Sequence, residues 1–311
     1  MEFFKRTPSI DFMGMRRVTY AISVVLMVAS IVLVAVRGLN FGVDFTGGVV
    51  IEVNYPAAAD IDGARDALTQ AGFDEAQVQS FGSSRDLAVR VPPPQDGDIN
   101  ELSVQVGEAL RAADPGVVVR RTEVVGPQVG RDLTEQGGLA LLFTFIGILI
   151  YVTFRFEKKM ASSTVLAAIH DPLVILGFFA VTQLPYDLSV LAAVLAVIGY
   201  SINDTVVVFD RVRELFLLMR KATPYDVLNA AVNQTLSRTL MTSFSVLFVV
   251  VSLYAFGGET LKAFSLAIIV GVFVGTYSSI FVSAALVLDM KVKAQDLMPI
   301  KKDDPELDAL P

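Results

Sequence analysis

The sequence predicts a polytopic α-helical membrane protein with six transmembrane helices and a small α+β domain between the first and second of them. Hydrophobic residues make up 53% of the 311-residue chain, which is too apolar for an ordinary soluble domain of this length. Six apolar runs each approach the roughly 20 residues that a helix needs to cross the hydrocarbon core. One long polar segment, residues 37–136, separates the first run from the other five.

The apolar runs set the expected limits of the spans. They lie at Val18–Val36, Gly137–Phe154, Ala161–Thr182, Leu188–Phe209, Thr239–Phe256 and Phe264–Leu288. The first run is too long for the apolar core of a signal peptide, and Arg37 follows it where a small-residue cleavage site would stand. We therefore expect an uncleaved anchor at 18–36, with residues 137–289 forming the other five helices and their loops.

Lysine and arginine counts predict the orientation of the chain. Basic residues gather in four segments, 1–17, 155–159, 211–221 and 290–311, and the short loops between them hold only Lys262. Because short cytoplasmic loops carry the excess of Lys and Arg, we expect both termini in the cytoplasm and residues 37–136 outside. Residues 210–236 predict two amphipathic helices along the cytoplasmic face, broken at Thr223 and Pro224.

The outer segment alternates strand and helix patterns. Residues 48–55 predict a strand, and a helix follows with Asp60 as its N-cap. Alternating runs on either side of the sequence GSSRD predict a hairpin, and a second helix that ends before Pro115 leads into a last strand at 116–126. The order β-α-β-β-α-β is that of a small ferredoxin-like α+β layer.

The composition argues against an enzyme and against a nucleic-acid partner. The outer segment holds 16 Asp and Glu against 8 Lys and Arg, an acidic balance that disfavours nucleic acid. It also lacks a nucleophile elbow, a phosphate loop and metal-ligand spacing. The chain has no cysteine, and His170 is its only histidine, which excludes thiolate and multi-histidine metal sites. We expect no enzymatic activity, no metal and no organic cofactor, and interpret the outer domain as a contact module.

Glycines mark two places of close approach. The segment GLNFGVDFTGG places Gly42, Gly47 and Gly48 between the first span and the outer domain. Because glycine permits positive φ and close contact with another backbone, we expect a tight connection or hinge there, with a plain turn as the alternative. In the sixth span, small residues recur every four positions around Gly271 and Gly275, which predicts a seam for another helix of this chain or of a partner.

Two charged residues inside predicted spans form the main candidate site. Asp204 shares a face of the fourth span with Ser201, and Arg238 belongs with Thr242 to a polar stripe on the fifth. The two spans run in opposite directions on either side of the cytoplasmic loop, with Asp204 shortly before that loop and Arg238 just after it. Both residues therefore lie in the cytoplasmic half of the membrane, where they can pair. An ionised Asp costs roughly 3 kcal/mol at the bilayer centre, and we expect Asp204 to bind and release an ion. The alternatives are a static polar contact for Asp204 and a snorkelling side chain for Arg238.

The third span contains a second polar pair. His170 and Asp171 lie near its middle and precede Pro172, which leaves a carbonyl one turn earlier without its amide donor. Two titratable groups at this depth indicate part of an ion path, to which Asn203 of the fourth span is a further candidate contributor. The alternative is a His and an Asp that satisfy each other at a kink.

Five stretches together resemble one known family. They are GLNFGVDFTGG, HDPLVILGFF, VIGYSINDTVVVFDRVRE, TPYDVLNAAVNQTLSRTLMTS and YAFGGETLKAFSLAIIVGVFVGTYSSI. In this combination the chain resembles, from about Phe3 to Leu288, the SecF family of the bacterial SecDF protein-export complex, within the resistance-nodulation-division superfamily. The family's acidic residue of the fourth span falls on Asp204, and its arginine of the fifth falls on Arg238.

The resemblance implies a location, partners and a role. It implies the bacterial inner membrane, a heterocomplex with SecD beside the SecYEG translocon, YajC and YidC as further candidate partners, and a translocating polypeptide as cargo. The proton gradient, or sodium in some marine bacteria, would drive export. Two other functions stay open from the residues: a structural scaffold that holds SecD without coupling ions, and half of a small-molecule efflux pump. The small outer domain argues against the pump.

Overall fold

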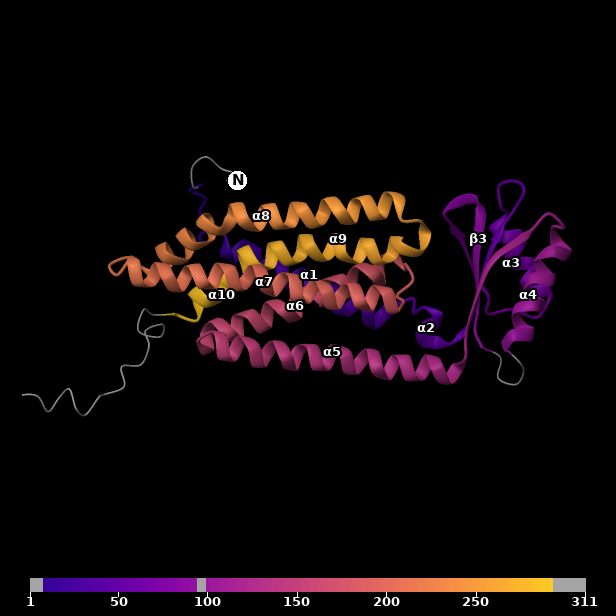
Figure 1. Ribbon diagram of the computed structural model, residues 1–311, viewed down its shortest axis with the longest axis horizontal. Coiled ribbons are helices and arrows are strands. Elements are labelled where there is room, and N and C mark those ends of the chain that lie inside the picture. Colours follow the sequence, from indigo (N-terminus) through magenta and orange to yellow (C-terminus); the bar gives the residue numbers. More distant parts are fainter. Residues whose placement is uncertain (1–7, 94–98, 293–311) are drawn as a thin grey trace, which may run out of the picture.

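The computed structural model describes residues 8–93 and 99–292. Most of the predicted cytoplasmic tail therefore lies outside the described residues, as do residues 1–7. The chain forms an elongated molecule, with a helical bundle at one end and an α+β domain at the other (Figure 1). The elements in chain order are α1 Arg16–Arg37, α2 Val43–Thr46, β1 Gly48–Asn54, α3 Ile61–Gln70, β2 Gln77–Phe81, β3 Ser83–Val91, α4 Ile99–Ala113, β4 Val118–Val125, α5 Pro127–Arg155, α6 Lys158–Thr182, α7 Leu188–Leu218, α8 Pro224–Phe256, η1 Glu259–Leu261, α9 Lys262–Tyr277, the π-helical turn η2 Ser278–Ser283 and α10 Ala284–Asp289.

Six helices of the described chain are long and apolar enough to cross a membrane, which confirms the predicted number of spans. They are α1, α5, α6, α7, α8 and the continuous segment Glu259–Asp289. Several extend past the apolar runs: α5 begins at Pro127, with the proline at its first turn, and α7 ends at Leu218. Hydropathy marks only the part of a helix that suits the hydrocarbon core, whereas backbone hydrogen bonding continues the helix into water.

Residues 210–236 differ from the two separate amphipathic helices that the sequence predicts. α7 runs unbroken to Leu218 and α8 begins at Pro224, so that each expected surface helix is the end of a span. The predicted break at Thr223 and Pro224 is present. There the Thr223 hydroxyl accepts a hydrogen bond from the Asp226 amide (3.3 Å), in a capping box that starts α8. The extensions persist because their apolar residues, such as Val227 and Leu228, are buried in the bundle core.

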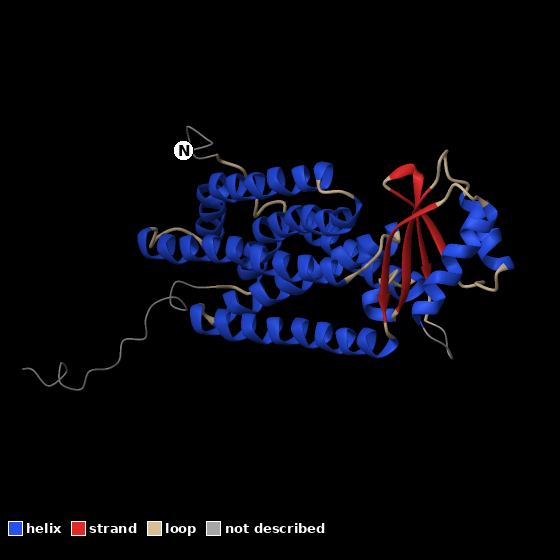
Figure 2. Ribbon diagram, turned by 45° about the vertical axis from the view of Figure 1, so that its right-hand side comes forward, coloured by secondary structure: helices blue, strands red, loops and turns tan. Residues whose placement is uncertain are grey.

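The α+β domain has the predicted ferredoxin-like order of elements. Its antiparallel sheet has the strand order β2-β3-β1-β4, and α3 and α4 cover the face that turns away from the bundle (Figure 2). Val49, Ile51 and Val53 of the central strand β1 are fully buried against these helices. The Asp60 carboxylate caps α3 by accepting hydrogen bonds from the amides of Asp62 and Gly63, both at 3.1 Å.

The hairpin turn is shorter than the sequence predicts. Ser83–Asp86, read as part of the turn, belongs to β3, and the chain reverses at Gly82 with φ of 82°. Residues after β1 stabilise this extension, because the Tyr55 amide donates to the Arg85 carbonyl (2.7 Å) and the Ala59 amide to the Ser84 carbonyl (2.8 Å). Contacts from a neighbouring segment therefore convert a polar, turn-like sequence into strand.

The glycine-rich segment forms a packed joint between domain and bundle. The Gly42 amide donates to the Tyr186 carbonyl and the Tyr186 amide to the Asn40 carbonyl, both at 2.8 Å, which ties the segment to the α6–α7 loop. Gly48 has φ of 118°, and a Cβ there would lie 2.5 Å from the Val91 carbonyl oxygen. The segment is held on several sides and contains the short helix α2, so neither a plain turn nor a free hinge describes it.

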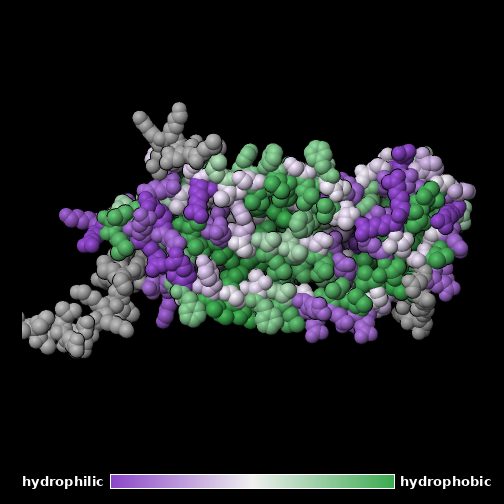
Figure 3. Space-filling model, in the orientation of Figure 1, coloured by the Kyte–Doolittle hydropathy of each residue, from purple (hydrophilic) through white to green (hydrophobic). Residues whose placement is uncertain are grey.

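The bundle has an inner and an outer group of spans. The inner spans are about half buried: of the residues in the most apolar 18-residue stretch, 56% are buried in α6, 56% in α7 and 50% in the sixth span. The corresponding shares for α1, α5 and α8 are 17%, 11% and 17%. On the face shown in Figure 3, the bundle carries a broad hydrophobic band, with hydrophilic residues at the end away from the domain. The candidate site residues of the third and fourth spans thus belong to the inner group.

Candidate functional site

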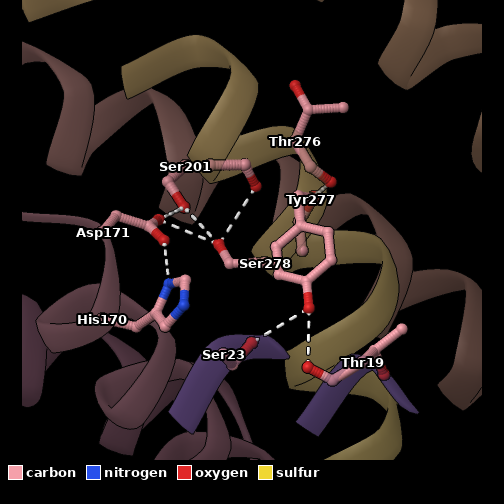
Figure 4. Close-up of polar contacts among 10 residues, drawn as sticks. Thr19, Ser23, His170, Asp171, Ser201, Thr276, Tyr277 and Ser278 are labelled. Atoms are coloured by element: carbon pink, nitrogen blue, oxygen red, sulfur yellow. Dashed lines mark hydrogen bonds and ion pairs between the residues drawn. The ribbon is translucent and has the colours of Figure 1, made fainter. Parts of the chain in front are cut away.

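A buried polar cluster joins three spans in the interior of the bundle (Figure 4). The Asp171 carboxylate of α6 uses one oxygen toward His170 Nδ1, at 2.9 Å, and its other oxygen accepts hydrogen bonds from Ser201 of α7 and from Ser278 of η2, the latter at 2.9 Å. All four residues are at most 2% exposed. We call these four residues, His170, Asp171, Ser201 and Ser278, the Asp171 cluster.

The glycine seam of the sixth span permits this cluster to form. A Cβ on Gly275 would lie 3.0 Å from Ser201 Cβ, and one on Gly271 would lie 2.3 Å from a methyl group of Val197. Both glycines therefore face α7 at close range, which places the seam contact within this chain. The close approach brings Ser278, three residues after Gly275, to the carboxylate of Asp171.

Tyr277 connects the neighbourhood of the cluster to the first span. Its hydroxyl donates to the Thr19 carbonyl (2.7 Å) and lies 3.1 Å from the Ser23 hydroxyl. The Tyr277 ring also lies beside the imidazole of His170, with 6.3 Å between the ring centres. The interior of α1, α6, α7 and the sixth span is thereby linked through polar side chains.

Asp204 lies one turn after Ser201 on α7 but in different surroundings. Its side chain is 2% exposed, and its Oδ2 is buried without a hydrogen-bond partner. Tyr200 and Thr242 lie beside it. Nearby, the Tyr200 hydroxyl contacts the Ser243 hydroxyl (2.7 Å), which in turn contacts Thr276 at 2.7 Å. Asp204 thus borders a chain of hydroxyl groups between α7, α8 and α9.

Arg238 acts on Asp204 without touching it. No ion pair joins the two within 4.0 Å in the part of the chain that the structure describes, although the arginine is close enough for a Coulombic interaction. Arg238 is exposed on the surface of α8, where its carbonyl accepts a hydrogen bond from Thr242 (3.2 Å). The predicted direct pairing is therefore absent from this conformation of the isolated chain.

The structure brings some predicted residues together and separates others. Ser201, His170 and Asp171 share one cluster, Thr242 lies beside Asp204, and Asn203 is exposed on α7. Sequence reasoning missed four hydroxyl residues of the interior: Ser243, Thr276, Tyr277 and Ser278. The last three form a polar run within an apolar span, which is a signal that could have found them.

A second polar region lies between the sheet and the bundle. A cavity of about 390 Å³ there is lined by charges of both signs. Burial lowers the pKa of Arg90, which donates hydrogen bonds to Asn40 Oδ1 (2.9 Å) and the Phe41 carbonyl (2.8 Å). Burial also raises the pKa of Asp187, the residue that caps α7. These contacts fix the domain on the glycine-rich joint.

No group of three or more His, Asp and Glu side chains with the arrangement of a metal site occurs among the described residues. The fold and the interior therefore define a polytopic membrane protein that carries an inserted ferredoxin-like domain and buries ionisable residues between its spans.

Comparisons with known proteins identify the family. The profile described as "Protein export membrane protein SecD/SecF, C-terminal" matches residues 105–293, and the "SecD/SecF GG Motif" matches residues 32–55. The chain is 44% identical to protein translocase subunit SecF of Vibrio alginolyticus, over 100% of this chain and 99% of the relative. It is 45% identical to that of Pseudomonas aeruginosa, over 95% and 96%. The chain belongs to the SecF family of protein translocase subunits.

A solved structure agrees with this assignment. The crystal structure of SecDF from Thermus, described as a translocon-associated membrane protein, matches with a TM-score of 0.84 and 36% identity. The match covers 93% of this chain and 40% of that one, so the SecDF chain is much longer. SecDF in a super-membrane-facing form matches over the same share with a TM-score of 0.69. The chain is accordingly a membrane protein of the bacterial inner membrane.

Proposed function

We propose that this chain is the SecF subunit of an ion-gradient-driven complex with SecD that assists polypeptide export at the SecYEG translocon. Its relatives are named protein translocase subunits, and a SecDF chain contains a region that matches almost all of it. YajC and YidC are further partners in this proposal, which rests for them on family resemblance. In this function the chain performs no enzymatic chemistry and needs no cofactor besides the coupling ion, a proton or sodium.

The observation that carries the proposal is the state of Asp204. It is a buried carboxylate in a span, one of its oxygens has no hydrogen-bond partner, and no basic side chain of the described residues forms an ion pair with it. An uncompensated buried carboxylate is costly. Ion binding removes that cost, and so does the approach of a cation from another helix.

Arg238 is the cation placed to make that approach. It is exposed on α8, and the same helix presents large apolar side chains outward, among them Phe244 and Phe248. A partner subunit that covers this face would desolvate Arg238 and strengthen its attraction to Asp204. We assign that covering to SecD. Loss of the ion from Asp204 then draws Arg238 inward, and ion binding releases it, which makes a two-state element that a gradient can bias.

Asp204→Asn tests the role of the carboxylate. The variant keeps the volume but cannot ionise, so gradient-stimulated export in proteoliposomes with SecD and SecYEG should fall to the unstimulated level at normal complex yield. Asp210→Asn, the same change near the end of α7 where Asp210 pairs with Arg155 at 2.6 Å, should retain stimulation. Full stimulation by Asp204→Asn would support the scaffold function instead. The same export assay, run once with a proton gradient and once with a sodium gradient, identifies the coupling ion.

The proposal also places both termini in the cytoplasm and the α+β domain in the periplasm. The chain has no cysteine, so single-cysteine labelling reports topology directly. Arg85→Cys on the domain and Arg220→Cys in the turn between α7 and α8, both exposed positions, should react with an impermeant maleimide from opposite sides. Labelling of both from the same side would refute this orientation.

A further inference from the structure

Two features of the Asp171 cluster lack a partner. Among the described residues, the Asp171 carboxylate has no permanently charged cation beside it, and Nε2 of His170 has no hydrogen-bond partner. Asp171 is 0% exposed, and its one ion-pairing contact in the described chain is His170, which is charged only when protonated. The other ionisable groups nearby are Tyr277 on α9 and Asp204, one turn beyond Ser201 on α7. From α1, the Thr19 carbonyl and the Ser23 hydroxyl contact the Tyr277 hydroxyl.

The arrangement of donors shows where an added proton would reside. One carboxylate oxygen of Asp171 already accepts from two hydroxyl groups, those of Ser201 and Ser278. The other oxygen faces His170 Nδ1 at 2.9 Å, which is the distance of a hydrogen bond that either partner can donate. A proton held along this contact leaves the pair neutral overall, as acid with imidazole or as carboxylate with imidazolium.

His170 supplies a second, independent indication of a ligand. Its Nε2 is buried without a hydrogen-bond partner, on the side of the ring that faces Tyr277 (Figure 4). The contact with Asp171 uses Nδ1 alone, so the second ring nitrogen stays open to a further partner. A ring nitrogen in this position accepts a proton or donates one, whereas sodium prefers oxygen ligands.

We propose that Asp171 and His170 together hold one exchangeable proton, at a site separate from Asp204. Proton binding removes the uncompensated charge of the cluster, and proton release restores a carboxylate that holds α7 and η2 through two hydroxyl donors. Because Ser201 precedes Asp204 by one turn on the same helix, the protonation of Asp171 is transmitted to the helix that carries Asp204. The proposal does not depend on whether Asp204 couples an ion to export.

The single histidine makes the proton directly observable. With ¹⁵N-histidine labelling, and an affinity tag that contains no histidine, the magnetic resonance spectrum of the purified chain in lipid shows one imidazole. From about pH 5 to about pH 9, the two nitrogen signals of the wild type should pass through one transition. Asp171→Asn should abolish it, because a buried imidazolium then lacks its counter-charge. Asp204→Asn, the matched change one turn beyond Ser201, should retain it.

Two further measurements keep the test decisive. If Asp171→Asn does not fold, Ser278→Ala removes one donor from the carboxylate at little change in volume and should alter the transition. Exchange of potassium for sodium at fixed pH should leave the signals in place. Wild-type signals that are constant over the whole range, a transition unchanged in the Asp171 and Ser278 variants, or signals that respond to sodium and not to pH would each overturn the proposal.

Discussion

Asp171 and Asp204 are both buried aspartates of the inner spans, yet they differ in their hydrogen-bond partners. Asp171 accepts from two serine hydroxyls and contacts a histidine, so both of its oxygens have partners. Asp204 has one oxygen with no partner, and its nearest arginine stays at the protein surface. The difference lies in the packing of α9, which brings Ser278 to Asp171 and only uncharged groups toward Asp204.

This contrast separates a carboxylate whose hydrogen bonds join three spans from one with an oxygen that has no hydrogen-bond partner. Hydrogen bonds to a charged group contribute about 1.5–3 kcal/mol each, and a buried group left unsatisfied costs about 1–3 kcal/mol. By these magnitudes the loss of Asp171 should destabilise the fold more than the loss of Asp204. Three changes test or refine this division.

The largest effect is expected from truncation of the first aspartate. Asp171→Ala leaves Ser201, Ser278 and His170 without their shared acceptor, and should destabilise the chain by about 3 kcal/mol. Asp204→Ala should cost about 1 kcal/mol or less, since one oxygen of the carboxylate it removes is itself unsatisfied. Unfolding of both variants in the same detergent, followed by circular dichroism against temperature, compares them. Equal losses would show that the two aspartates are equivalent in the fold.

A change at the seam should have an intermediate effect. Gly271→Ala places a methyl group 2.3 Å from a methyl of Val197, which forces α9 away from α7 and loosens the contact of Ser278 with Asp171. We expect a loss of about 2 kcal/mol, read from the same thermal unfolding. Gly199→Ala on α7, where a Cβ would meet nothing within 4 Å, is the control and should not lower stability. A tolerated Gly271→Ala would mean that the seam is not tightly packed.

The smallest effect concerns Asp11, a solvent-exposed aspartate that serves as a reference for the two buried ones. A hydrogen bond from the Tyr225 hydroxyl, with a second from the Gly14 amide, lowers its pKa. Since the folded pKa is depressed, this contact stabilises the protein above about pH 4, and the contribution disappears as pH falls through the folded pKa.

Tyr225→Phe should raise the pKa of Asp11 toward its ordinary value and weaken the pH dependence of stability below about pH 4. The carboxyl signal of Asp11, followed by magnetic resonance against pH, measures the change. Near neutral pH the variant should unfold close to the wild-type temperature, because the contact is exposed and screened. An unchanged titration of Asp11 would show that Tyr225 does not bind it in solution.

Sequence patterns were sufficient for much of the fold. The six spans, the β-α-β-β-α-β order, the cap at Asp60 and the break at Thr223 and Pro224 follow from residue composition and local periodicity, and the structure agrees. The errors share one cause. Ser83–Asp86 looked like a turn, and residues 210–236 looked like surface helices, because distant segments that stabilise the observed conformation are not visible in local sequence.

Hydropathy alone reveals that carboxylates, a histidine and an arginine stand within or beside apolar runs of the sequence, because a charge in or next to such a run is conspicuous. The hydrogen-bond partners of these residues depend on tertiary packing. Whether an aspartate is satisfied depends on which helix approaches it and at what distance, and here that depends on two glycines of the sixth span and on a serine three residues further along. Side-chain contacts between spans are set by helix packing, which hydropathy and periodicity do not encode.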